Sequence, residues 1–71
     1  DAGNELYKAQ LRVNFAFKQA RKTGDIYNMS FYADENADEF FAEAFVMYDN
    51  GEALPDYIKE TVEEVLSFGK L

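Results

Sequence analysis

Residues 36–45 read Asn-Ala-Asp-Glu-Phe-Phe-Ala-Glu-Ala-Phe, and this stretch predicts a helix that sets the organisation of the chain. Asn36 followed three residues later by Glu39 matches a capping box, a common signal for a helix start. The helix is expected to run from about residue 36 to 48. Its apolar face consists of Ala37, Phe40, Phe41, Ala44, Phe45, Met47 and Tyr48. Glu39 and Glu43 lie one turn apart on the flank of that face, where they form a short acidic ridge.

Two further helices are predicted on either side of this one. The first covers about residues 4–22, with Asn4 as its cap and Gly24 as its stop, and the third covers about 55–68, starting at Pro55. Between the first two helices, residues 26–32 loosely alternate and are rich in β-formers, which favours a short extended segment or an ordered loop. The predicted fold is therefore all-α: residues 1–71 form a single small three-helix domain or fragment with a short extended segment between helices 1 and 2.

The first predicted helix carries two apolar stripes, and a free-standing three-helix domain needs only one. One stripe runs from Leu6 to Ala20 at spacings of three and four residues, and the other consists of Tyr7, Leu11 and Phe15. Two interpretations remain open. Either a protein partner or an upstream part of a longer parent protein covers the second stripe, or the other two helices wrap around a single wide face.

Composition narrows the classes of function. The chain has 71 residues, 48% of them apolar, with no His and no Cys, and its net charge is −7. The charge is uneven, because the part up to Tyr32 has five bases and three acids, whereas the rest has two bases and eleven acids. Such an acidic surface repels phosphate, so nucleic acid is not an expected partner. No apolar run approaches the length of about 18 residues that a membrane span requires. Since the chain starts at Asp1 without Met, we expect a piece of a longer protein.

The stretch from Tyr32 to Phe45 resembles the C-terminal part of the catalytic domain of anthrax lethal factor-like proteins, which are zinc metallopeptidases of the gluzincin type. The run Glu-Phe-Phe-Ala-Glu-Ala-Phe stands unbroken at 39–45, with Asn36 three residues before it and Tyr32 seven. The resemblance implies that Glu39 is the third zinc ligand and that Tyr32 assists at the scissile carbonyl of a peptide substrate. It also implies a setting in secreted toxins or in mobile-element and phage proteins. The resemblance extends over about residues 31–68, but only the seven-residue run is a specific match.

This chain lacks one motif of that family, and its absence determines which activity we expect of the chain alone. The family's His-Glu-x-x-His helix supplies two zinc ligands and the general base, and this chain has no His. We therefore expect zinc in a full-length parent and none in this chain alone, which would be inactive by itself. In the parent, Glu43 would accept a hydrogen bond from a ligating His and fix its tautomer.

The same residues also allow interpretations without catalysis. Glu39 would then complete the capping box with Asn36, Glu43 would be a solvated neighbour, and Tyr32 would be a packing residue. The chain as a whole would be a non-catalytic, acidic helical module for protein–protein interaction. A third interpretation, cation binding by the acids between 34 and 39, lacks the spacing and the Gly of a calcium loop.

Overall fold

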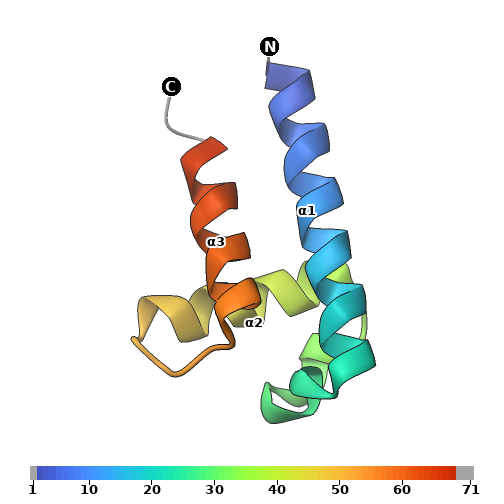
Figure 1. Cartoon of the computed structure of the whole chain (residues 1–71), viewed down its shortest axis with the longest axis vertical. Coiled ribbons are helices and arrows are strands. Elements are labelled where there is room, and N and C mark those ends of the chain that lie inside the picture. Colours follow the sequence, from blue (N-terminus) through green and yellow to red (C-terminus); the bar gives the residue numbers. More distant parts are fainter. Residues whose placement is uncertain (1, 69–71) are drawn as a thin grey trace.

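The computed structural model describes residues 2–68, without the side chain of Ala2, and it confirms the all-α fold class. Three helices are formed: α1 (Ala2–Thr23), α2 (Ala37–Asp49) and α3 (Asp56–Phe68). Helices α1 and α3 lie side by side and run in opposite directions, and α2 crosses them near one end (Figure 1). Because only α2 lies across this pair, each helix keeps one side that no other described element covers.

Of the two forms that the sequence favours between α1 and α2, a short extended segment or an ordered loop, the structure contains the ordered loop. It consists of two 3-10 turns, η1 (Asp25–Asn28) and η2 (Phe31–Asp34). Gly24 ends α1 in a left-handed conformation with φ of 85°, which a residue without a Cβ adopts at little cost. The Ser30 side chain then accepts a hydrogen bond of 3.3 Å from the Tyr32 amide and starts η2. These local hydrogen bonds satisfy the backbone without a neighbouring strand.

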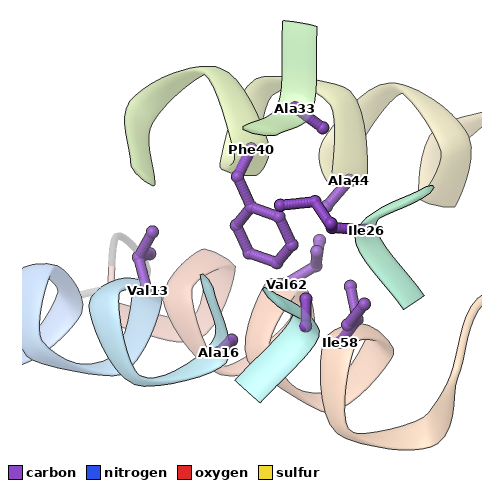
Figure 2. Close-up of a cluster of buried hydrophobic side chains, with 9 residues drawn as sticks. Val13, Ala16, Ile26, Ala33, Phe40, Ala44, Ile58 and Val62 are labelled. Atoms are coloured by element: carbon purple, nitrogen blue, oxygen red, sulfur yellow. The ribbon is translucent and has the colours of Figure 1, made fainter. Parts of the chain in front are cut away.

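The core lies where α2 meets the other two helices. Phe40 points from α2 toward α1 and α3, and it is fully buried (Figure 2). Its ring lies 5.7 Å from that of Phe17, measured between centroids. The buried apolar side chains are those of Val13, Ala16, Ala20, Ile26, Ala33, Phe40, Ala44, Ile58 and Val62. Four of these nine are alanines, whose short side chains let the elements approach closely around the one large ring.

Helix α1 uses only one of its two apolar faces in this core. Tyr7, Leu11 and Phe15, which we call the α1 stripe, are between 51% and 65% exposed. At about 100° per residue, the stripe lies on the opposite side of α1 from the buried Ala16 and Ala20. Wrapping of a single wide face by α2 and α3 is therefore wrong for the described residues.

Leu6 also departs from the sequence-based expectation. The stripe from Leu6 to Ala20 supplies the buried residues of α1, but Leu6 itself is exposed. The first turns of α1 extend past the end of α3 (Figure 1), and Leu6, the fifth residue of α1, is 72% exposed.

A polar cluster joins the end of α1 to η1 and to the start of α3. The Tyr57 hydroxyl donates a hydrogen bond of 2.7 Å to Asp25 Oδ2, and the Thr23 hydroxyl donates to the same oxygen at 2.9 Å. Burial raises the pKa of Tyr57. The hydrogen bond of 3.2 Å between the Tyr57 and Thr23 hydroxyls lowers this pKa, and the neighbouring Asp25 raises it, so that the net shift is upward. The neutral phenol is thus favoured in the folded chain.

Removing the Tyr57 hydroxyl tests this cluster. We expect Tyr57→Phe to lower the free energy of unfolding by about 1 kcal/mol at neutral pH, because Asp25 loses a donor. A tyrosine with a raised folded-state pKa contributes its full stabilisation below its ordinary pKa of 10.0 and loses it as pH rises through the folded-state value. In urea unfolding followed by circular dichroism, the free energy of unfolding should therefore fall less steeply with pH above 10 in Tyr57→Phe than in the wild type. A slope equal to that of the wild type would contradict the assignment, and the exposed Tyr27→Phe is the control.

The central role of Phe40 gives a second prediction. Phe40→Ala should cost about 3–5 kcal/mol of unfolding free energy, since it leaves a cavity between three helices. Phe40→Leu fills part of that space and should remain folded with a smaller loss, which keeps the comparison measurable if the alanine variant unfolds. Phe45→Ala, on the exposed side of α2, should cost clearly less. Equal losses for Phe40→Leu and Phe45→Ala in urea titrations would argue against this core.

Candidate functional site

The start of α2 is held by Asn36, as the sequence predicts. Asn36 has extended backbone angles, and its Oδ1 accepts a hydrogen bond of 2.9 Å from the Glu39 amide. Its carbonyl accepts the first helical hydrogen bond, from the Phe40 amide at 3.0 Å. The backbone that carries Glu39 is therefore fixed from both sides, by the cap and by the burial of the next residue.

The carboxylate of Glu39 is not used for this capping. Only one half of the capping box forms, because within residues 2–68 the Glu39 side chain makes no hydrogen bond and no ion pair. Glu39 is exposed, and it precedes the buried Phe40 by one residue. Because consecutive helical residues point about 100° apart, the inward Phe40 turns Glu39 away from the core. The carboxylate thus stands free on a fixed backbone.

Glu43 follows Glu39 by one turn and is half-buried. The exposed Ala42 and Val46 share this side of the helix, and we call the four residues the outer face of α2. An acidic pair bordered by two apolar side chains can contact a helix that is itself partly apolar and partly polar. The predicted ridge of Glu39 and Glu43 is therefore formed as a helical surface, although no contact between the two carboxylates is observed.

Tyr32 lies on η2, which packs against α2. It is 60% exposed, and its ring stands edge-on to that of Phe31, with 6.3 Å between the centroids. Its hydroxyl makes no hydrogen bond within the described residues, with Glu39, with Glu43 or with any other side chain. The structure thus places Tyr32 on an element next to the outer face of α2 without joining it to the two acids.

A complete metal site is not formed by the part of the chain that the structure describes. No group of three His, Cys, Asp or Glu residues there could hold a metal ion. Among the acids between 34 and 39, Asp34 is paired with Arg21 at 3.2 Å. Tetrahedral catalytic zinc takes three protein ligands. The residues present therefore do not fit a zinc ion by themselves, and Glu39 fits at most one position of a shared site.

A hollow between η1 and η2 was not predicted from the sequence. Ile26 and Met29 line it together with the exposed Tyr27 and Phe31, and Asp34 and Glu35 stand at the same hollow. In an extended segment Tyr27 and Phe31 would lie on one face, and Ile26 would point to the opposite face. The 3-10 turns bring Ile26 to the same hollow as the two aromatic residues.

The chain matches no protein family, and no characterised protein or solved structure is similar enough to count as a match. No helix within residues 2–68 is long and apolar enough to cross a membrane.

A pair of variants tests whether Asn36 caps α2 without a contribution from the Glu39 carboxylate. Asn36→Ala should lower the free energy of unfolding by about 1 kcal/mol, because the Glu39 amide loses its acceptor. Glu39→Gln should change it by less than about 0.5 kcal/mol, since the carboxylate makes no hydrogen bond and no ion pair within residues 2–68. Both are measured by urea unfolding. A loss in Glu39→Gln as large as that in Asn36→Ala would show that the carboxylate is engaged in capping after all.

Proposed function

We propose that this chain is the C-terminal helical part of a lethal-factor-like zinc metallopeptidase domain, in which Glu39 supplies one zinc ligand. The observation that carries the proposal is the state of the Glu39 carboxylate, which is exposed and, within residues 2–68, free of hydrogen bonds on a capped helix. A side chain on a fixed helical backbone can keep a ligand in place with little loss of freedom on binding. The Glu-Phe-Phe-Ala-Glu-Ala-Phe run at 39–45 supports the same assignment.

Zinc would be shared between this chain and residues outside it. Since the described residues offer no three-ligand group, the other ligands must come from elsewhere, and the resemblance implies two histidines of a His-Glu-x-x-His helix. The outer face of α2 suits the approach of such a helix, because Ala42 and Val46 offer apolar contact beside the acids. The chemistry of the metal would belong to that assembled site and not to this chain.

Two further residues have proposed roles in the assembled domain. Glu43, half-buried one turn after Glu39, would accept a hydrogen bond from the ring N–H of a ligating histidine and hold its orientation. Tyr32 has a free hydroxyl on the element that packs against α2, and it would donate a hydrogen bond to the oxygen that gains negative charge during peptide hydrolysis.

A second candidate function is that of a non-catalytic helical interaction module. It is favoured by the α1 stripe, which exposes three large apolar side chains on the side of α1 away from the core. Contiguous apolar surface of this kind marks protein contact sites. This function requires neither zinc nor Glu39.

The two candidate functions predict different zinc contents for the purified protein. The polypeptide extended by its natural upstream sequence is purified as wild type, as Glu39→Gln and as Glu60→Gln, and zinc is measured by plasma mass spectrometry after dialysis against graded chelator. We expect about one zinc ion per chain in the wild type and in the α3 surface variant Glu60→Gln. Glu39→Gln should lose zinc at a chelator concentration at least about tenfold lower, because one of three protein ligands is weakened.

Equal zinc retention in Glu39→Gln and Glu60→Gln would show that Glu39 is not a zinc ligand. Absence of zinc from all three proteins would overturn the metallopeptidase proposal and leave the interaction module.

A further inference from the structure

The charges around the α1 stripe indicate what kind of surface covers it. Helix α1 has five basic residues, and both arginines among them are bound to the chain itself. Arg12 pairs with Glu64 at 2.7 Å, and Arg21 pairs with Asp34 at 3.2 Å. The fold has therefore used two of the five positive charges of α1 in its own contacts.

The three lysines of α1 are exposed and make no ion pair within residues 2–68. Lys18 follows Leu11 by seven residues and Phe15 by three, which places it in line with the stripe. Lys8 lies beside Leu11 and Phe15 by the same spacings, and Lys22 lies one turn beyond Lys18. Lys8 thus lies beside the stripe and Lys18 and Lys22 continue it beyond Phe15, whereas Glu5, the acid on the described part of α1, lies about a third of a turn away from it.

We propose that the α1 stripe docks an amphipathic helix whose apolar face is bordered by carboxylates. Tyr7, Leu11 and Phe15, at i, i+4 and i+8, present the pattern that packs against a helical partner. Acidic residues beside the apolar face of that partner would meet Lys8, and acidic residues at the end of that face would meet Lys18 and Lys22. This inference specifies the partner of the interaction module, and it depends neither on Glu39 nor on zinc.

A second copy of the chain is a poorer occupant. Pairing two α1 helices along their stripes would bring six lysines to one interface without an opposing acid from α1, and such like-charge contacts oppose association. The remaining surface of the chain is acidic, but charges more than about 8 Å away are largely screened at physiological salt. The local lysines therefore dominate at the stripe.

Two synthetic peptides test the charge preference. Both are designed helices with leucine along one face, and they differ only in that the flanking positions are all glutamate in one and all lysine in the other. Binding to the chain is measured by fluorescence anisotropy at physiological salt. We expect the glutamate peptide to bind at least about tenfold more tightly than the lysine peptide.

Three variants of the chain locate the site. Leu11→Glu should abolish binding of the glutamate peptide, because it puts a like charge in the centre of the stripe, whereas Tyr27→Glu on η1 should leave it unchanged. Lys8→Glu combined with Lys18→Glu should reduce the preference for the glutamate peptide to less than about threefold. All four altered side chains are exposed, and circular dichroism confirms that each variant folds.

Each alternative outcome has a definite meaning. Equal binding of both peptides, lost in Leu11→Glu, would retain a docking face but overturn the acidic partner. Binding of neither peptide would overturn the inference and the interaction module together. A dimer of the chain alone that dissociates in Leu11→Glu, observed by sedimentation, would identify a second copy as the occupant and contradict the inference.

Discussion

Burial of Phe40 is the interaction on which both the fold and the candidate site depend. Its ring fills the space where α2 crosses α1 and α3, beside Phe17 and among small alanines. With Phe40 directed inward, the helical rotation of about 100° per residue turns Glu39 outward. The cap at Asn36 then holds the first turn of α2 through the Glu39 amide and leaves the carboxylate free. The contact that stabilises the core therefore also sets the direction of the proposed zinc ligand.

Features encoded by local signals were predictable from the sequence. The predicted helix at 36–48 is observed at Ala37–Asp49, and the predicted cap Asn36 is confirmed. The third helix begins at Asp56, directly after the predicted start at Pro55, whose carbonyl accepts hydrogen bonds from the amides of Ile58 and Lys59. Caps, prolines and apolar periodicity act over a few residues, so one chain segment contains all the information needed.

Features that depend on tertiary arrangement were not predictable in the same way. Residues 26–32 alternate like a strand, but no strand pairs with them among the described residues, and Gly24 and Ser30 fold them into 3-10 turns. The two stripes of α1 were both visible in the sequence, whereas the choice of the covered one depends on where α3 lies. Whether the Glu39 carboxylate completes a capping box or stays free is likewise decided by side-chain geometry, which the motif alone leaves open.

The chain thus forms a small core from one side of each helix and keeps its distinctive chemistry on two uncovered surfaces, the α1 stripe and the outer face of α2. The most direct test of Glu39 as a zinc ligand is anomalous diffraction at the zinc edge from crystals of the proposed full-length parent. It should place a Glu39 carboxylate oxygen about 2.0–2.2 Å from the metal. Zinc bound without Glu39, or a Glu39 carboxylate folded back onto the Asn36 amide, would contradict it.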